Sequence, residues 1–351
     1  MIEQYRNVYG MLEDEISRDI YLHRLNYMVS GDYRHIREIV TRYLPKLSPL
    51  TGETIEDLRA SMPQDRKVVL YGAGAFGKEM LACWEQDKRF LGFCSHTRKK
   101  QEEGYLGYPC ISPEELLQRR DLSVVISALW ARDEIMQVLR DGNYPEELIF
   151  HTKGLFVEDS PGQYFDPEFM TYGEEEVLVD AGCFNLNSAL KLREYCGHVK
   201  KVYAFEPDPE NYAVCLEKRA RTGFSEVELL PLGTWSRRTT LHFHAAGMGC
   251  SGIRESGGTS IQVAPIDEIV DPADRVTMIK MDIEGAELES LQGARKTIRR
   301  DRPKLAVCIY HKPEDMIEIP LYIKELVPEY KLYIRHHSNS GTETVLYAVM
   351  P

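Results

Sequence analysis

The first sixty residues alternate between apolar and charged positions in a helical rhythm. Apolar residues from Ile2 to Tyr21 recur at spacings of three and four, which places them on one face of a helix. After the break at Ser30-Gly31-Asp32, a second helix is predicted from Tyr33 to Leu44, ending at Pro45. We expect residues 1–60 to form a helical arm that packs on the following domain or on a second subunit, which would make a homodimer.

An alternation of strands and helices follows over residues 61–150. The segment KVVLYGAGAFGKEM places Gly72, Gly74 and Gly77 directly after an apolar strand and at the start of a helix, the context that a nucleotide-binding glycine turn requires. Later apolar runs predict further strands. We therefore expect a small Rossmann-like domain.

Two interpretations of this glycine turn are open. In the first, it binds the phosphates of a nucleotide or a nucleotide-linked sugar, helped by the basic run from His96 to Lys100. In the second, the glycines allow close packing of helix on strand, and the basic run is a solvated loop. The second strand ends in Cys94 and Ser95 instead of the acidic residue that would bind a ribose, so the packing interpretation is favoured.

Residues 151–176 are predicted to be a linker, because they are rich in Pro, Gly and acidic residues and show no clean period. Four aromatic residues give this linker enough apolar area to dock on its neighbour and to roof a pocket. These residues are Tyr164, Phe165, Phe169 and Tyr172.

Between Val177 and Arg219, two apolar strands flank a predicted helix, and each strand ends in an acidic residue. The first strand runs into Asp180 and Gly182, and the second runs into Glu206. Gly182 lacks a Cβ, so backbone can approach a ligand closely, and Glu206 can accept hydrogen bonds from both hydroxyls of a ribose. The unit therefore predicts an adenosine-type ligand. Its other predicted contacts are Cys183 and Asp208.

The charge of Asp180 narrows the choice of ligand. A dinucleotide brings a pyrophosphate, which an acidic residue beside the turn would repel, whereas S-adenosylmethionine carries a sulfonium and an ammonium. The alternative is that Asp180 only ends the strand and accepts hydrogen bonds from the turn amides. The first interpretation makes S-adenosylmethionine the expected cofactor.

A second pair of acidic residues follows another predicted strand. Asp282 stands at the end of Met278 to Met281, and Glu284 precedes a predicted helix from Ala286 to Ile298. Ligands of open α/β sheets bind at the carboxyl ends of strands, so this pair should face the cleft of the earlier two acids. The four acids would repel one another unless a cationic ligand compensates them. Alternatively, Asp282 or Glu284 caps the helix.

The next predicted strand ends at His311, which is the preferred general base because its pKa lies near neutrality. Glu284 and Asp282 are the alternative bases. Asp282 is also a predicted cofactor contact. A metal at this pair ranks last, since no histidine neighbours it in the sequence, and we expect none.

The order of these segments resembles the FkbM family of S-adenosylmethionine-dependent methyltransferases. The segments are DAG, FEPDPENY, IDEIV and KMDIEGAELESLQGA, followed by a C-terminal strand pair. The resemblance covers Val177 to Met350 and implies a class I methyltransferase sheet of seven strands with an antiparallel last hairpin. The resemblance also implies that the methyl group is transferred to an oxygen atom, such as that of a hydroxyl. Such enzymes usually carry a further glycine four residues after Gly182, where this chain has Leu186.

Two segments of the C-terminal domain, residues 177–351, are less regular. Val227 to His244 predicts two strands around a turn, and Leu229 to Leu232 is the expected third strand of the catalytic sheet. Ala245 to Ser260 is rich in glycine and serine with no apolar rhythm. Such a loop is expected to be a lid beside the pocket, or else a hairpin tip without a role.

Composition excludes several classes of partner. Forty-three basic against 55 acidic residues give a net charge of -12, which argues against a nucleic-acid backbone. No apolar run approaches the roughly 20 residues of a membrane span, and the N-terminus is too polar for a signal peptide. The eight cysteines show no paired spacing and should be small buried residues. We expect a cytoplasmic protein without a membrane partner.

These patterns predict an S-adenosylmethionine-dependent methyltransferase that acts on a small-molecule hydroxyl, with a carbohydrate or nucleotide-linked sugar first among acceptors. Two alternatives are kept. The chain could bind the cofactor without turnover, and this alternative is favoured by Leu186, which replaces the usual second glycine of the turn. It could also be a nicotinamide-dependent nucleotide-sugar enzyme that uses the N-terminal glycine turn.

Overall fold

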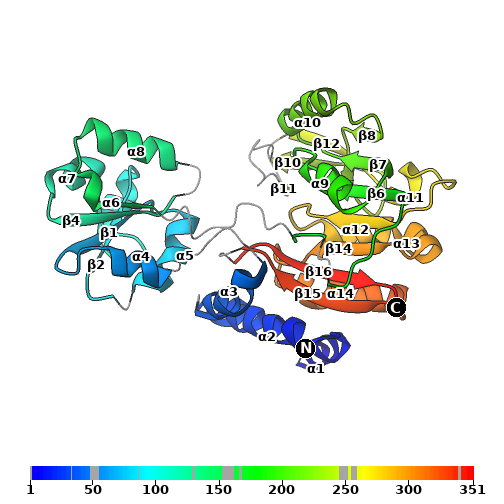
Figure 1. Cartoon of the computed structure of the whole chain (residues 1–351), viewed down its shortest axis with the longest axis horizontal. Helices are drawn as coiled ribbons and strands as arrows, with labels where there is room; N and C mark the ends of the chain where they lie inside the picture. Colours follow the sequence, from blue (N-terminus) through cyan, green and yellow to red (C-terminus); the bar gives the residue numbers. More distant parts are fainter. Residues whose placement is uncertain are drawn as a thin grey trace. The chain divides into compact units, whose positions relative to one another are not determined.

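The chain folds into two compact units, shown in the computed structural model of Figure 1. The structure describes residues 2–32, 34–47, 55–85, 87–128, 131–151, 162–165, 168–244, 252–253, 259–338 and 341–351. The N-terminal unit comprises residues 23–160 with 338–341, and the C-terminal unit comprises residues 1–22, 161–337 and 342–351. The domain boundaries expected at residues 60, 150 and 176 stay predictions.

The N-terminal unit is built on a parallel five-stranded sheet in the order β3-β2-β1-β4-β5. Its buried strands and flanking helices confirm the Rossmann-like prediction. The strands are β1 Lys67–Tyr71, β2 Phe90–Cys94, β3 Cys110–Ile111, β4 Leu122–Ile126 and β5 Ile149–His151. The helices are α3 Arg34–Leu47, α4 Ile55–Ser61, α5 Ala75–Trp84, α6 Arg98–Glu103, α7 Pro113–Gln118 and α8 Arg132–Asp141.

The glycine turn between β1 and α5 is packed by the protein itself. A Cβ on Gly72 would clash with the carbonyl of Ser127, and a Cβ on Gly77 would clash with the carbonyl of Gly72. The Lys100 ammonium donates to the Ala73 carbonyl at the same turn. Two of the three glycines thus serve close packing, as the favoured interpretation of the sequence expects. Nucleotide binding at this turn stays a prediction.

The C-terminal unit contains the predicted seven-stranded sheet, in the order β15-β16-β14-β13-β6-β7-β8. Neighbouring strands are parallel except for β16, which is antiparallel to both β14 and β15. The strands are β6 Glu176–Ala181, β7 Val199–Phe205, β8 Val227–Leu230, β13 Met278–Met281, β14 Lys304–Cys308, β15 Lys331–His336 and β16 Thr344–Val349. The helices are α9 Asn187–Tyr195, α10 Pro209–Thr222, α11 Ile266–Ile269, α12 Glu287–Gly293, α13 Arg295–Asp301 and α14 Asp315–Leu326.

A second sheet of four strands lies in the same unit, in the order β11-β10-β12-β9. Its strands are β9 Gly233–Thr234, β10 Thr239–His244, β11 Gly252–Ile253 and β12 Thr259–Ala264. The two strands expected within 227–244 are found as β8 and β10, but they belong to different sheets, since β8 joins the large sheet and β10 pairs with β12. The third strand ends at Leu230 instead of Leu232, because Pro231 cannot donate to the ladder. The predicted lid falls mostly at 245–251 and 254–258, outside the described residues.

Two helix predictions need correction. The single helix expected from Ala286 to Ile298 is two helices that meet at Ala294. Gly293 permits the break, because its Cα packs against the Trp235 carbonyl where a side chain would clash. Asp267 then caps α13 by accepting hydrogen bonds from two backbone amides at its start, 2.9 and 2.8 Å away. The helix α3 was expected to end at Pro45, but it extends two residues further. Proline removes one backbone hydrogen bond of the helix, and here that loss does not end it.

The predicted N-terminal helix is also divided, into α1 Ile2–Met11 and α2 Glu15–Ser30. The link between them pairs with the edge strand β15, where the Glu13 amide donates to the Leu332 carbonyl at 3.0 Å. Ser17 continues this pairing by accepting the Ile334 amide at 2.9 Å. Residues 2–22 thus cover an edge of the large sheet that would otherwise offer unpaired backbone groups. The sequence did not predict this docking site for the arm.

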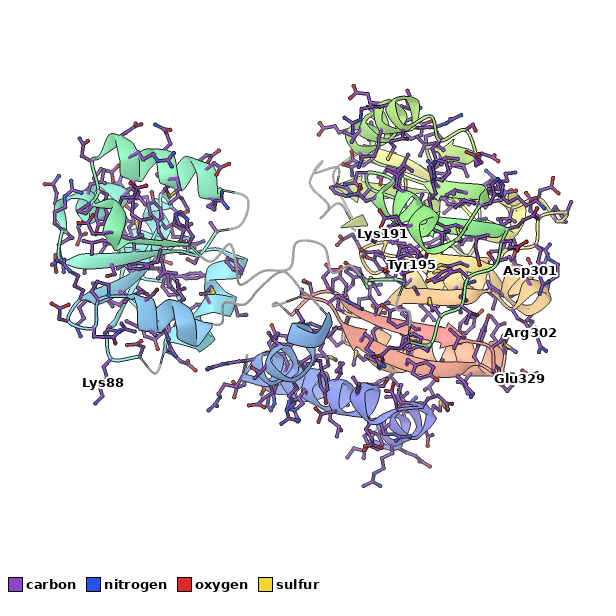
Figure 2. All side chains as sticks on the ribbon, in the orientation of Figure 1. Lys88, Lys191, Tyr195, Asp301, Arg302 and Glu329 are labelled. Atoms are coloured by element: carbon purple, nitrogen blue, oxygen red, sulfur yellow. The ribbon has the colours of Figure 1, made fainter. Side chains whose placement is uncertain are left out.

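The linker docks as its aromatic residues predicted. Phe165 is buried and stacks on Tyr195 of α9, with ring centroids 5.6 Å apart. Figure 2 labels Tyr195 beside Lys191, whose ammonium lies 5.9 Å from the same ring. Phe169 stacks on Tyr333 of β15 at 4.3 Å. The six cysteines that the structure resolves in detail are free and buried, as expected. None of the described helices is long and apolar enough to cross a membrane.

A charged contact fastens the N-terminal segment to the sheet. Arg335 of β15 has a side chain only 2% exposed, and its guanidinium lies 2.7 Å from the Asp14 carboxylate and 3.4 Å from Glu168. Removing one partner of a buried charge leaves the other poorly solvated. The contact between Asp14 and Arg335 therefore holds the link in place.

Replacing Asp14 by Ala should lower the free energy of unfolding by about 2 kcal/mol, less than for a fully buried pair because Asp14 is partly exposed. Urea unfolding followed by circular dichroism measures this change. The matched control is Glu15→Ala, which removes a surface pair with Arg18 and should cost less than about 0.5 kcal/mol. Equal losses for both variants would contradict a special role for Asp14.

Candidate active site

The predicted site residues gather at the carboxyl ends of four adjacent strands. Asp180 lies near the end of β6, and Glu206, Asp282 and His311 follow β7, β13 and β14. Because β13 lies between β6 and β14, and β7 lies on the other side of β6, these ends share one edge of the sheet. This is the edge at which open α/β sheets bind ligands. The structure thus brings the residues to one face, as their order in the sequence predicts.

The turn after β6 is tight and strained. Gly182 has a φ of +77°, and a Cβ there would clash with the Asp282 carbonyl. Phe184 and Leu186 also have positive φ values of 51° and 62° without being glycine. Leu186 is buried, and it occupies the position where a second glycine was expected. Buried packing therefore holds a backbone conformation that a leucine adopts only at a cost.

Glu206 is held by backbone amides at the mouth of this turn. One carboxylate oxygen accepts the Phe184 amide at 2.9 Å, and the other accepts the Asp208 amide at 2.9 Å. Burial raises the pKa of Glu206 to about 7, against the lowering effect of these two amides. The Asn211 side chain is a third donor to this carboxylate, which leaves lone-pair capacity for a further donor.

The two other predicted cofactor contacts have structural roles. Asp208 caps α10, because its carboxylate accepts the amides of Glu210 at 2.8 Å and Asn211 at 3.2 Å. Cys183 is buried with its sulfur 3.8 Å from that of Cys215. Both residues support the turn, and a direct contact with cofactor stays a prediction for each.

Asp180 already has a cationic partner inside the protein. Its carboxylate is fully buried and lies 3.2 Å from the ammonium of Lys280 on β13. Lys280 also donates to the Gly182 carbonyl at 2.6 Å and lies 5.1 Å from the Tyr164 ring centroid. Burial lowers the pKa of Lys280, but the carboxylates of Asp180 and Asp282 outweigh it and raise that pKa above its usual value. The expectation that a ligand must compensate this acid is therefore wrong.

Asp282 is oriented by two tyrosines. The Tyr164 hydroxyl donates to one carboxylate oxygen at 2.8 Å, and the Tyr310 hydroxyl lies 3.3 Å from the other. Tyr310 also approaches Glu343 at 3.1 Å. Burial and the charge of Asp282 raise the pKa of Glu343 to about 7. Because Tyr164 fixes one carboxylate oxygen of Asp282, the second oxygen points toward His311.

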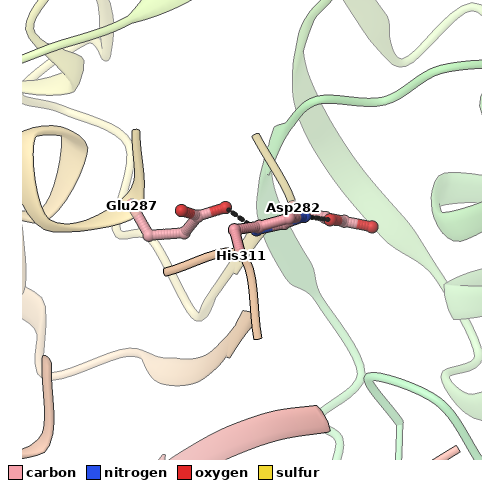
Figure 3. Close-up of side chains that lie close together, drawn as sticks. All are labelled: Asp282, Glu287 and His311. Carbon is pink, nitrogen blue, oxygen red and sulfur yellow. Dashed lines mark ion pairs between the residues drawn. The ribbon is translucent and has the colours of Figure 1, made fainter. Parts of the chain in front are cut away.

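His311 lies between carboxylates on both sides of its ring (Figure 3). Its Nδ1 is 2.9 Å from Glu287, and its Nε2 is 3.5 Å from Asp282 and 3.8 Å from Glu284. Burial alone would lower the pKa of His311, but these carboxylates, Glu287 first, raise it to about 9. The structure thus gathers the three predicted catalytic residues, and the imidazole has a strongly negative environment.

Glu284 has an unusual backbone as well as an unusual charge state. Its φ is +56°, a conformation that costs energy in a residue other than glycine. Burial raises its pKa to about 7, with Asp282 and Glu287 adding to the effect and His311 opposing it. Its side chain is 32% exposed, so it can meet a ligand.

Sequence reasoning missed four residues of this site. Lys280 could have been found, since alternation along β13 places it on the same side as Asp282. Glu287 belongs to the DIEGAE segment and follows Glu284 by one helical turn. The aromatic residues of the linker predicted that it covers the pocket, but not that the Tyr164 hydroxyl donates to Asp282. No local signal marks Glu343, whose position depends on the closing hairpin.

The comparisons with known proteins agree with this architecture. Residues 180–337 match the family model of the methyltransferase FkbM domain. The crystal structure of an FkbM methyltransferase from Methylobacillus flagellatus KT is 20% identical, covers 91% of this chain and 98% of its own, and has a TM-score of 0.50. That likeness shows the fold. No curated protein sequence matches the chain.

Two other structures resemble the chain over about half its length. An rRNA methylase from Streptococcus thermophilus is 18% identical, covers 51% of this chain and 89% of its own, and has a TM-score of 0.34. A precorrin-6y C5,15-methyltransferase from Geobacter metallireducens GS-15 is 8% identical, covers 56% and 90%, and has a TM-score of 0.37.

The family match and the strand-end site lie in the same part of the chain. The matched residues include the strained turn after β6, the DIEGAE segment and His311. Residues 180–337 therefore form a methyltransferase domain of the FkbM family, whose members use S-adenosylmethionine.

Proposed function

We propose that the protein transfers the methyl group of S-adenosylmethionine to a hydroxyl of a small molecule, with a sugar or nucleotide-linked sugar as the first class of acceptor to test. The observation that supports this proposal is the pair of partly exposed carboxylates, Asp282 and Glu284, around the nearly buried His311, at the same sheet edge as the buried Glu206. One part of the edge suits a nucleoside, and the adjacent part suits a reacting hydroxyl.

The cofactor end of the site is assigned to the turn after β6. Glu206 would accept hydrogen bonds from the ribose hydroxyls through the lone-pair capacity that its protein donors leave over. The backbone of Gly182 and Cys183 would lie against the cofactor. Asp208 would support this turn indirectly, because it caps α10. Asp180 acts through Lys280, which binds the Gly182 carbonyl and fixes the turn.

The acceptor end is assigned to the residues after β13 and β14. Methyl transfer to a hydroxyl is an in-line displacement at the sulfonium, in which the O–C bond forms as the S–C bond breaks and the hydroxyl proton leaves. His311 is the predicted base, with Glu284 and Asp282 as alternatives. Because the surrounding carboxylates raise the pKa of His311 to about 9, its imidazole must first lose a proton near neutral pH. Glu287 orients the imidazole from its far side, 2.9 Å from Nδ1. Most of the acceleration would come from aligning the two reactants.

The alternatives are separated by calorimetry. An active methyltransferase should bind both S-adenosylmethionine and its demethylated product, whereas a nicotinamide-dependent enzyme should bind NAD(P). Turnover with a sugar hydroxyl then separates an enzyme from a protein that only binds the cofactor. A cytoplasmic location, the lack of a nucleic-acid or membrane partner, and a homodimer formed through the N-terminal helices also stay predictions.

Replacing Glu206 by Gln should weaken S-adenosylmethionine binding by about 1 to 3 kcal/mol, because charge-assisted hydrogen bonds to the ribose are lost. This corresponds to a rise in Kd of roughly 5- to 150-fold, measured by calorimetry. Glu228→Gln on the neighbouring strand β8 is the control, since Glu228 faces solvent and pairs with Lys201. Unchanged affinity in the Glu206 variant would refute its ribose role.

Cofactor binding should also release protons near neutral pH. Burial raises the pKa of Glu206 to about 7, and ribose donors favour the charged carboxylate, so binding lowers that pKa. A protonated Glu206 must lose its proton, so affinity should fall as the pH drops below 7. At pH 7, about half a proton per site should leave. Binding enthalpies in buffers of different ionisation heat measure it. No buffer dependence in the wild type, or an equal one in Glu206→Gln, would argue against this linkage.

Replacing His311 by Ala should lower turnover about 10²- to 10⁴-fold while S-adenosylmethionine affinity stays within about twofold. The reason is that His311 faces the acceptor end of the site and not Glu206. Steady-state kinetics and cofactor titration give the two numbers. Glu289→Gln, on the same helix as Glu287 but hydrogen-bonded to Ser236, is the control and should change neither. If the His311 variant keeps full turnover, His311 is not the base, and Glu284 or Asp282 becomes the preferred candidate.

A further inference from the structure

We propose that Asp282, Glu284 and His311 bind a divalent cation, with Glu287 as the carboxylate that orients the histidine. The site takes oxygen ligands from two carboxylates and a nitrogen ligand from the imidazole. A cation of the Mn²⁺ type accepts this combination.

The separations of the ligand atoms fit one ion. Nε2 of His311 lies 3.5 Å from an Asp282 oxygen and 3.8 Å from a Glu284 oxygen. Metal–ligand bonds of about 2.1 to 2.3 Å, meeting at angles between about 90° and 120°, span about 3 to 4 Å between ligand atoms. Asp282, Glu287 and His311 also keep one ligand atom each within 4.8 Å of one another. Glu284 is not a member of that group, so its side chain, which is 32% exposed, would have to rotate to bring its oxygen onto the same ion as Asp282 and His311.

The second carboxylate on the histidine matches the usual support of a metal ligand. A histidine that binds a metal commonly donates its other ring N–H to a carboxylate, which fixes its tautomer and orientation. Glu287 lies 2.9 Å from Nδ1 on the side of the ring opposite Asp282 (Figure 3). Nε2 is thus left to point at Asp282 and Glu284. This arrangement assigns Glu287 a supporting role and Nε2 the coordinating one.

Unpartnered buried atoms point to a missing ligand. The His311 side chain is only 8% exposed, and among the described residues neither Nε2 nor Nδ1 has a hydrogen-bond partner, although Nδ1 lies 2.9 Å from Glu287. Glu287 is fully buried, and its second oxygen has no partner in the same set. Buried polar atoms normally have partners. A cation at Nε2 would supply one for the histidine.

The charges around this point are unbalanced. Three carboxylates surround one imidazole, and the two nearby lysines make their closest contacts elsewhere, although the charge of Lys280 also acts on Asp282. Lys280 binds Asp180 and the Gly182 carbonyl, and Lys312 donates to the Gly285 carbonyl. Burying like charges together is costly unless a cation compensates them. A divalent ion would supply this compensation.

Such an ion would also have a chemical use, and this step rests on the proposed function. A metal-bound hydroxyl loses its proton more readily than a free one. The ion would therefore orient the acceptor oxygen and favour loss of its proton to solvent, and His311 would then act as a ligand and not as the base. Binding of the ion itself requires neither methyl donor nor acceptor, so it can be measured independently.

The test uses the full chain, stripped with EDTA and desalted, and titrated with Mn²⁺ while the sharp six-line electron paramagnetic resonance signal of free Mn²⁺ is followed. The wild type should bind one ion per chain. His311→Ala and Glu284→Gln should weaken binding at least about tenfold, and Glu287→Gln by about 10- to 100-fold. Glu289→Gln is the matched control on α12 and should bind within about twofold of the wild type.

Two results would overturn the site: a wild type that leaves the free Mn²⁺ signal intact, or His311 and Glu284 variants that bind as tightly as the wild type. Far-UV circular dichroism shows whether each variant folds. If His311→Ala does not, Glu284→Gln decides, because the Glu284 side chain is 32% exposed and its removal leaves the core intact. If the wild type transfers methyl groups but does not bind Mn²⁺, the metal site is refuted and the proposed methyltransferase function is not.

Discussion

The ammonium of Lys280 is buried between β6 and β13, and the catalytic edge depends on it. It neutralises Asp180, binds the carbonyl of Gly182 and faces the ring of Tyr164. An ammonium without partners would be strongly disfavoured at this depth. These contacts tie together the cofactor turn, the neighbouring strand and the aromatic linker. Because Tyr164 in turn donates to Asp282, the orientation of the acceptor residues follows from the same buried charge.

The acidic residues of the edge then divide by environment. Asp180 is sealed inside with its lysine, and Glu206 is buried but held by two amides with capacity for more donors. Asp282 and Glu284 are partly exposed around a nearly buried histidine. Residues of one charge thus have distinct environments: one stabilises the fold with its lysine, one is proposed to bind the ribose, and two are proposed to meet the acceptor. Backbone strain at Leu186 and Glu284 coincides with the places where ligands are proposed to bind.

Local patterns predicted the sheet and the edge well, because strand periodicity, glycine turns and acidic strand ends are properties of adjacent residues. These patterns alone predicted that Asp180, Glu206, Asp282 and His311 lie at one edge of the sheet. They could not predict partners that are distant in the chain. Lys280 meets Asp180 from one hundred residues away, as the register of β13 on β6 requires. The break at Ala294 likewise depends on a tertiary contact of Gly293 with Trp235, which overrides a continuous helical pattern.

The pairing of residues 12–17 with β15 has a consequence for how the chain is made. Residues 12–17 are translated long before the strand with which they pair, and residues 23–160 form a separate unit between them. Domains generally fold as units during synthesis, the earlier ones first. The inserted unit can therefore mature while the opening segment still waits for its strand. Completion of the C-terminal unit is thereby postponed until β15 has been translated.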